Sequence, residues 1–207
     1  MEVASLVGCA VATGVGAAMY TAEVRAGQSV VVYGAGGVGL NILQGAALCG
    51  ADPIIAVDTN MTKMEIAKQF GATHTLLSDD QTIDNIRKLT NGRGADHVFE
   101  SVGLPKLQEI ALEAVRPGGM LTLVGLSPMG SGTNLPGAVI TRTEKTIRGS
   151  YYGTVNPRRD FPLFVDLYVA GKLKLDELVT CKYSLDQINE AYQDMLTGEV
   201  ARGIIVF

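Results

Sequence analysis

Short apolar runs rich in β-branched residues alternate with helix-like segments along most of this chain of 207 residues. These runs predict strands at residues 29–33, 53–58, 74–77, 95–100, 120–124 and 146–150. The segments between them predict helices at residues 40–49, 62–70, 82–89 and 106–115. Buried strands separated by helices are typical of a parallel sheet with helices on both faces. The alternation therefore predicts an α/β fold, a doubly wound parallel sheet.

The pattern changes after about Tyr151. The remaining tail predicts two helices, at residues 157–170 and 185–196, and a terminal strand at residues 203–207. It has too few strands for a domain of its own, so we expect a C-terminal helical and strand extension that packs on something else. The predicted division is an inter-domain helix region at 1–24, the main domain at 25–151 and the C-terminal segment at 152–207.

The N-terminal segment has no charged residue between Glu2 and Glu23. A signal peptide would have basic residues before its apolar core, whereas Glu2 follows Met1 here. A transmembrane helix would be rich in Leu, Ile and Phe, but this segment is mostly Gly, Ala, Val, Ser and Thr. We therefore expect a helix packed closely against the sheet, and no membrane partner.

Composition narrows the class of protein further. Apolar residues make up 47% of the chain and charged residues 18%, which excludes a disordered protein. The net charge is −4 and the densest basic stretch is Arg158-Arg159, so we expect no nucleic-acid partner. The three cysteines, Cys9, Cys49 and Cys181, include no C-x-x-C pair, which argues against a disulfide framework and favours a reducing, cytoplasmic location.

A glycine-rich motif follows the first predicted strand, and it reads Gly34-Ala35-Gly36-Gly37-Val38-Gly39. The pattern G-x-G-x-x-G is weak alone, but between a strand and a helix it is the fingerprint of a dinucleotide-binding Rossmann fold. Gly34 permits the tight turn, Gly36 lets backbone amides approach a diphosphate, and Gly39 lets the helix lie close to the strand. The positive end of that helix also favours the diphosphate.

Asp58 ends the second predicted strand, 19 residues beyond Gly39. A carboxylate at this place accepts hydrogen bonds from the adenosine ribose and repels a 2′-phosphate, which predicts NAD rather than NADP as the cofactor. The alternative role for Asp58 is to cap the helix that starts near Met61.

Residues 7–18 (Val-Gly-Cys-Ala-Val-Ala-Thr-Gly-Val-Gly-Ala-Ala) resemble the signature that leads into the cofactor domain of zinc-containing medium-chain alcohol dehydrogenases. The spacing to Gly34, Asp58, Phe99-Glu100 and Val124-Gly125 also fits this family, as does the ending at residues 201–207. The block at residues 148–153 is similar to bacterial members of the alcohol and thiol-linked formaldehyde dehydrogenase branch. The resemblance covers practically the whole chain.

The resemblance implies roles for single residues. Cys9 matches the third protein ligand of the catalytic zinc, although a lone cysteine in an apolar helix is usually a small buried residue. Cys49 and Cys181 are expected in the core, and His74 and His97, which match no ligand position, at the surface or in turns. Thr13 and Val38 match positions beside the nicotinamide, and the backbone groups of Val124, Ser150 and Tyr152 match those that hold its carboxamide. Lys63 matches a contact with the adenosine ribose. Arg202 matches a residue that reaches the pyrophosphate. A solvated Arg202 is the alternative.

The family's N-terminal catalytic domain, which supplies the other two zinc ligands and the proton relay, has no counterpart in the sequence. The resemblance therefore implies the NAD(H)-binding portion of a zinc-dependent alcohol dehydrogenase, which oxidises alcohols or reduces aldehydes by hydride transfer. We expect this chain to be inactive alone, to contain no complete catalytic set, and to have the missing catalytic domain as its partner. The small alcohol or aldehyde substrate is not identified by these residues.

Residues 136–146 match the dimer edge of the family, which implies a homodimer or tetramer. Two other functions stay open at this point. One is a free-standing module that senses NAD(H) or regulates another protein, and the other is a structural dimerisation domain. An intact Cys9 argues against the sensor, because a module without zinc chemistry has no need of that thiolate.

Overall fold

The computed structural model describes residues 2–197 and 202–207, so that Met1 of the predicted N-terminal region and residues 198–201 of the predicted C-terminal segment lie outside the described residues. The main sheet has six strands in the order β3-β2-β1-β4-β5-β6, and every neighbouring pair is parallel. The strands are β1 (Val30–Tyr33), β2 (Ile54–Asp58), β3 (His74–Leu77), β4 (Ala95–Glu100), β5 (Val115–Leu123) and β6 (Thr146–Gly149). The predicted α/β fold with a doubly wound parallel sheet is confirmed.

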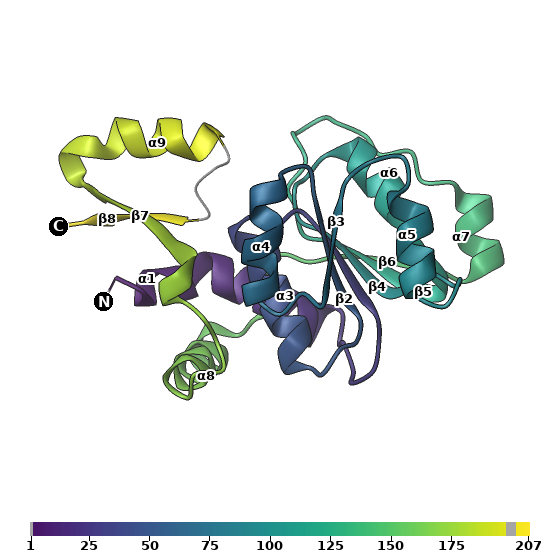
Figure 1. Ribbon diagram of the computed structural model, residues 1–207, viewed down its shortest axis with the longest axis horizontal. Coiled ribbons are helices and arrows are strands. Elements are labelled where there is room, and N and C mark those ends of the chain that lie inside the picture. The colour runs from purple at the N-terminus through teal and green to yellow at the C-terminus, as the bar shows by residue number, and fades with distance from the viewer. Residues whose placement is uncertain (1, 198–201) are drawn as a thin grey trace.

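Helices cover both faces of this sheet (Figure 1). On one face, α3 (Gly37–Leu48) and α4 (Met61–Gln69) pack over the side chains of Val30, Val32 and Phe99. On the other face, α5 (Thr82–Leu89), α6 (Pro105–Ala114) and α7 (Gly137–Thr143) pack over those of Val31, Val98 and Leu121. The sequence did not predict α7, which precedes the edge strand β6. That the edge forms a dimer stays a prediction.

The N-terminal helix is continuous from Ala4 to Thr21 and combines α1 (Ala4–Leu6) and α2 (Ala12–Gly16) with π-helical turns at Val7–Val11 and Ala17–Thr21. Within the described ranges it is the one helix long and apolar enough to cross a membrane, and 61% of that window is buried inside the molecule. Val11 and Val15 are fully buried in the same core as α3. The predicted helix packed closely against the sheet domain is therefore confirmed.

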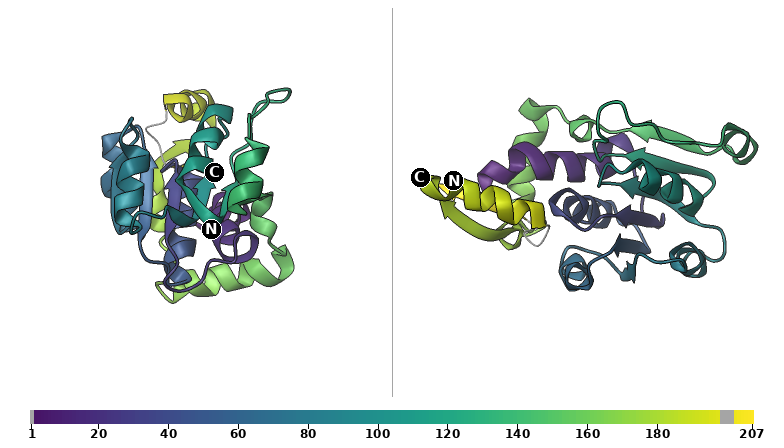
Figure 2. Two further views of the ribbon diagram at one scale, coloured as in Figure 1. Left: turned by 90° about the vertical axis from the view of Figure 1, so that its right-hand side faces the viewer. Right: turned by 90° about the horizontal axis from the view of Figure 1, so that it is seen from above.

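The C-terminal segment divides into two parts. Helix α8 (Pro157–Val169) places Phe164 in the core of the main sheet, together with Leu173, Leu175 and Leu178. Beyond them, β7 (Val179–Ser184), which the sequence did not predict, pairs in parallel with β8 (Arg202–Val206), while α9 (Ile188–Thr197) connects toward β8. This small sheet lies beside the start of α1 in both figures (Figures 1 and 2), where Lys182 and Glu2 form an ion pair.

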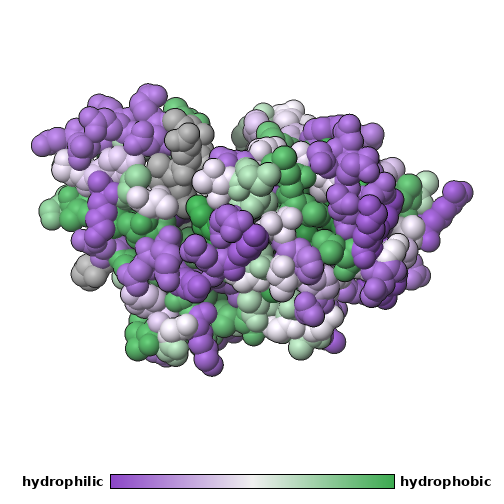
Figure 3. Space-filling model, viewed as in Figure 1, coloured by the Kyte–Doolittle hydropathy of each residue, from purple (hydrophilic) through white to green (hydrophobic). Residues whose placement is uncertain are grey.

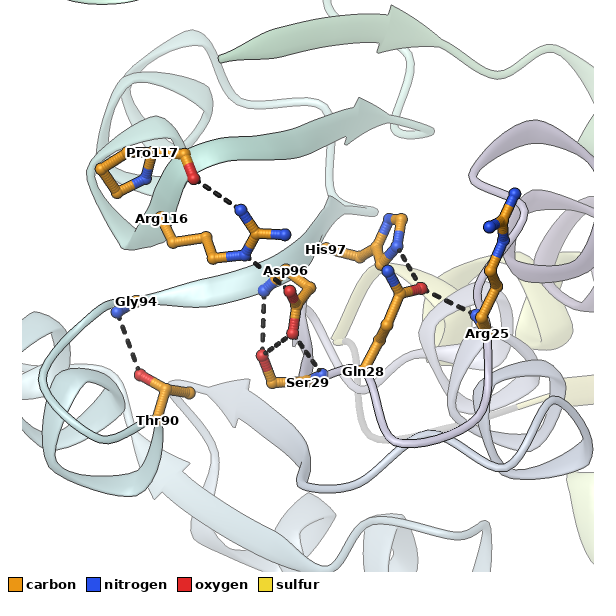
Figure 4. Close-up of polar contacts among 9 residues, drawn as sticks. All are labelled: Arg25, Gln28, Ser29, Thr90, Gly94, Asp96, His97, Arg116 and Pro117. Carbon is orange, nitrogen blue, oxygen red and sulfur yellow. Dashed lines mark hydrogen bonds and ion pairs between the residues drawn. The ribbon is translucent and has the colours of Figure 1, made fainter. Parts of the chain in front are cut away.

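A polar cluster joins the amino ends of β1 and β4 (Figure 4). The Asp96 carboxylate accepts hydrogen bonds from the Ser29 backbone N–H at 2.8 Å and hydroxyl at 2.7 Å, and from Arg116 Nε at 2.6 Å. His97 is 7% exposed, and its Nε2 lies 3.0 Å from Gln28 Oε1. The expectation of a surface or turn role is therefore wrong for His97, because β4 carries its side chain onto a covered face of the sheet, whereas His74 is exposed.

Replacing Asp96 by asparagine is expected to lower the free energy of unfolding by about 2 kcal/mol at neutral pH. The asparagine side chain has an NH₂ group in place of one carboxylate oxygen, and this group cannot accept the hydrogen bonds that Ser29 and Arg116 donate. Burial alone would raise the pKa of the Asp96 carboxyl, but the hydrogen bonds from Ser29 and Arg116 hold it below its ordinary value of 3.8. A carboxyl whose folded pKa is depressed stabilises the fold above its unfolded pKa of about 4, and this stabilisation disappears as the pH falls through the folded pKa.

Urea unfolding of the wild type and the Asp96→Asn variant, at neutral pH and at about pH 3, checks this expectation. The difference between the two proteins is expected to shrink at the lower pH. Asp80→Asn at an exposed carboxylate is the matched control and should change little. A difference for Asp96→Asn that stays constant with pH would contradict the assignment.

Candidate functional site

The glycine-rich turn lies at the carboxyl end of β1, where α3 begins at Gly37. Gly34 has a φ of +95°, which favours glycine, and a Cβ added to Gly39 would lie 1.7 Å from the Gly34 carbonyl oxygen. A Cβ added to Gly36 would meet no atom within 4 Å, so the outer side of the turn is open. The turn therefore leaves open space beside the amino end of a 12-residue helix, which is suited to a diphosphate.

Ser101 holds this turn in place, and the sequence did not point to it. Its hydroxyl reaches the Tyr33 carbonyl oxygen at 2.9 Å and the Gly34 carbonyl oxygen at 3.1 Å. Ser101 follows β4, and the order of the strands reverses between β1 and β4, so it lies where sheets of this kind bind ligands. That position, directly after the fourth predicted strand, is the signal that could have identified Ser101.

Asp58 ends β2 and turns its carboxylate toward the glycine-rich turn. One carboxylate oxygen accepts the Ala35 N–H at 2.7 Å, and the other accepts the Asn60 N–H at 3.0 Å. The Lys63 ammonium lies 3.9 Å from the first oxygen, and the Asp58 side chain is 9% exposed. Helix α4 is capped by Asn60, whose side chain accepts the Thr62 N–H. The alternative role of Asp58 as the helix cap is therefore not observed.

A cleft of about 220 Å³ opens beside Asp58. Asp58 and Lys63 form its polar end, while Val102, Leu104 and Leu107 contribute an apolar wall. Val102 is 48% exposed and Leu104 53% exposed, so both offer surface to a ligand. An apolar wall with a few polar groups at one end is the composition expected of a small-molecule site, and an adenosine matches both parts.

The positions predicted at the nicotinamide end lie along the same carboxyl edge of the sheet. Val124 directly follows β5, and the Ser150 N–H, after β6, donates to the Leu123 carbonyl oxygen at 2.8 Å. The Tyr152 hydroxyl donates to the Gly8 carbonyl oxygen, next to Cys9. The structure thus brings the helix that carries Cys9 and Thr13 together with the segment at 150–152, more than 100 residues later in the chain.

Arg202 lies apart from these residues, at the start of β8, where it lines a groove with α9. Its Nε is buried and has no hydrogen-bond partner among residues 2–197 and 202–207. The assignment of Arg202 to the pyrophosphate stays a prediction.

The residues described in this chain do not complete a zinc site. Cys9 is exposed and free, but nowhere in residues 2–197 and 202–207 do three or more His, Cys, Asp or Glu side chains gather as metal ligands. Zinc in proteins takes three or four such ligands. Cys49 packs against the core, and Cys181 on β7 is half-buried. The described residues of this chain therefore supply one candidate zinc ligand, Cys9, and not a complete set.

Comparison with known proteins agrees with this arrangement. Residues 37–170 match the model of the zinc-binding dehydrogenase family. The whole chain is 44% identical to the NDMA-dependent alcohol dehydrogenase of Amycolatopsis methanolica, of which it covers 56%, and 40% identical to the putative alcohol dehydrogenase D of Mycobacterium tuberculosis, of which it covers 57%. The crystal structure of benzyl alcohol dehydrogenase from Acinetobacter calcoaceticus superposes with a TM-score of 0.94 at 34% identity, over 99% of this chain and 56% of that one.

The chain thus spans about half the length of the relatives that it matches. The part that it covers contains the parallel sheet and the glycine-rich turn. The chain belongs to the zinc-binding dehydrogenase family.

Proposed function

We propose that this chain binds NAD(H) as the cofactor-binding part of a zinc-dependent alcohol dehydrogenase. The observation that carries the proposal is the Asp58 carboxylate, which is held by the Ala35 N–H between the glycine-rich turn and the cleft. From that place it can accept hydrogen bonds from the hydroxyls of an adenosine ribose. A 2′-phosphate would bring two negative groups together, and this favours NAD over NADP.

The chain's own residues bind and orient the cofactor. The backbone of the glycine-rich turn and the amino end of α3 hold the diphosphate, and Val102 and Leu104 pack against the adenine. The backbone at Val124, Ser150 and Tyr152 orients the nicotinamide toward the side of the molecule where Cys9 lies. When bound, the cofactor would supply the redox chemistry: NAD⁺ accepts a hydride as the alcohol is oxidised, and NADH donates one as the aldehyde is reduced.

The remaining chemistry requires groups from outside this chain. Cys9 would contribute one thiolate to a zinc ion, and the other ligands would come from a catalytic domain like that of the longer relatives. In the view of Figure 3, hydrophobic surface shows at the left-hand edge beside the small sheet, and the visible side of α9 is mostly hydrophilic. Several large apolar side chains on α9 and beside the small sheet are exposed, and they support contact with such a domain. They are Leu185, Ile188, Tyr192, Met195, Leu196 and Phe207.

The chain alone is therefore expected to bind NADH without turning over alcohols. The test combines NADH binding by fluorescence with a turnover assay of the same preparation, which contains Zn²⁺, NAD⁺ and a panel of primary, secondary and aromatic alcohols. Binding without turnover is the expected result. Turnover that a chelator abolishes would contradict the expected inactivity, and the absence of NADH binding would contradict the proposed function itself.

A further inference from the structure

The turn after β6 has an unusual backbone. Tyr152, Gly153 and Thr154 have φ angles of +55°, +64° and +57°, so three consecutive residues adopt the left-handed conformation. Only Gly153 does so without a steric cost, and a β-branched residue such as Thr154 is rarely found there. Strained backbone of this kind persists only where neighbouring groups hold it, and it is concentrated at ligand-binding sites.

Two sets of contacts hold the turn. A Cβ added to Gly153 would lie 2.3 Å from the Ala12 carbonyl oxygen, so the turn is pressed directly onto the N-terminal helix. On the same helix, the Thr21 hydroxyl lies 2.8 Å from the Ser150 hydroxyl and 2.7 Å from the Thr154 hydroxyl. Thr21 is 2% exposed and Ser150 is 8% exposed. A single buried hydroxyl thus bridges Ser150, two residues before the left-handed turn, and Thr154, the last residue of the turn.

The helix residue is itself fixed in position. Arg148 on β6 donates from its Nη1 to the Thr21 carbonyl oxygen at 2.5 Å and lies 3.8 Å from Glu23. The contact between Arg148 and Thr21 uses the backbone, so it survives a change of the Thr21 side chain. The hydroxyl bridge can therefore be removed without removing the contact between the helix and β6.

The position of the turn indicates which part of a dinucleotide it faces. A ligand of a doubly wound sheet crosses the carboxyl ends of the strands at the point where their order reverses. Asp58 on β2 marks the adenosine end, so the other end extends over β4, β5 and β6. Ser150 follows β6 on that side, and Tyr152 reaches the carbonyl oxygen next to Cys9. The turn therefore lies at the nicotinamide end.

We infer that Thr21 is a positioning residue for the nicotinamide half of NAD(H): its hydroxyl holds the left-handed turn at residues 152–154, and thereby the backbone of the segment at 150–154 that faces the nicotinamide. This inference rests on the proposed function, because it requires that the chain binds NAD(H). Thr21 itself touches no part of the cofactor and acts through the turn.

The test compares NADH with ADP-ribose, which contains the adenosine and diphosphate but lacks the nicotinamide. Both are titrated by calorimetry into the wild type and into Thr21→Val, which keeps the shape of the side chain but removes the hydroxyl. The dissociation constant for NADH is expected to rise about tenfold, because Ser150 and Thr154 lose their shared partner, and that for ADP-ribose to change less than about twofold. Thr21→Ser, which restores the hydroxyl, is expected to bind NADH nearly as the wild type does.

Two further variants complete the design. Thr154→Ala removes an exposed partner of the hydroxyl bridge and leaves the N-terminal helix unchanged, so we expect the variant to fold. Its dissociation constant for NADH is expected to rise about threefold, and that for ADP-ribose to stay the same. Thr143→Val is the matched control, since the Thr143 hydroxyl donates to the Val139 carbonyl oxygen within α7, and it should change the dissociation constant of neither ligand.

The outcomes separate the two proposals. If the wild type binds neither ligand, the proposed function is wrong and the role of Thr21 falls with it. If the wild type binds both ligands, but Thr21→Val and Thr154→Ala leave the ratio of the two dissociation constants unchanged, only the role of Thr21 is overturned. A selective loss of NADH affinity that Thr21→Ser restores would support the inference.

Discussion

The Asp58→Ala variant is expected to bind NADPH about as tightly as NADH, which changes the ratio of the two affinities about 100-fold relative to the wild type. Two effects act in the same direction. The ribose of NADH loses its acceptor, and the 2′-phosphate of NADPH no longer meets a carboxylate. In addition, Lys63, whose ammonium lies 3.9 Å from the Asp58 carboxylate, loses its anionic partner and becomes available to the phosphate.

Asp58 also accepts the Ala35 N–H, so the alanine variant loosens the glycine-rich turn as well. Asp58→Asn separates the two effects, because its amide oxygen can still accept from Ala35 while the charge is gone. We expect the asparagine variant to lose the discrimination against NADPH while keeping more of the affinity for NADH. Glu65→Ala, at an exposed carboxylate on the same helix as Lys63, is the matched control. An unchanged preference for NADH in both Asp58 variants would contradict the assignment.

The Gly39→Ala variant is expected to lose about 3 kcal/mol or more of its free energy of unfolding, and with it the binding of NADH. The added methyl would lie 1.7 Å from the Gly34 carbonyl oxygen, which is backbone and cannot turn aside as a side chain could. To relieve this contact, α3 must move away from β1, and the amino end of the helix would then leave the place where the diphosphate binds.

Gly36→Ala is the contrasting variant, because the added methyl meets no protein atom within 4 Å. It should unfold at nearly the same urea concentration as the wild type and yet bind NADH more weakly, since the methyl occupies the open side of the turn. Urea unfolding and NADH titration of both variants check the pair of expectations. A Gly39→Ala protein as stable as the wild type would contradict the close contact between helix and turn.

The sheet and the residues of the proposed adenosine site could be predicted from the sequence because their signals are local. A glycine-rich turn between a strand and a helix, and an acid at the end of the next strand, follow one another within 25 residues, from Gly34 to Asp58. Gly34 and Gly39 act through the backbone of the turn itself, and Asp58 ends the strand that pairs directly with β1. The structure accordingly places Asp58 against the turn, in contact with Ala35.

The parts that could not be predicted depend on contacts between distant segments. Thr21 and Ser150 are 129 residues apart, and only the packing of the N-terminal helix against β6 brings their hydroxyls together. The residues next to His97 in the sequence do not indicate that it is buried. It is buried because its side chain lies on a face of β4 that other elements cover. Strand β7 has mixed polarity and exists as a strand because β8 pairs with it. Contacts of this kind cannot be predicted from local sequence patterns.

Calorimetric titration of the wild-type chain with NADH and, separately, with NADPH tests the central claim most directly. Saturable binding of one NADH per chain, about 100-fold tighter than any binding of NADPH, is the result that the Asp58 carboxylate and the open glycine-rich turn predict. Binding of neither dinucleotide, or binding of NADPH as tight as that of NADH, would contradict the claim that this chain is an NAD(H)-binding domain.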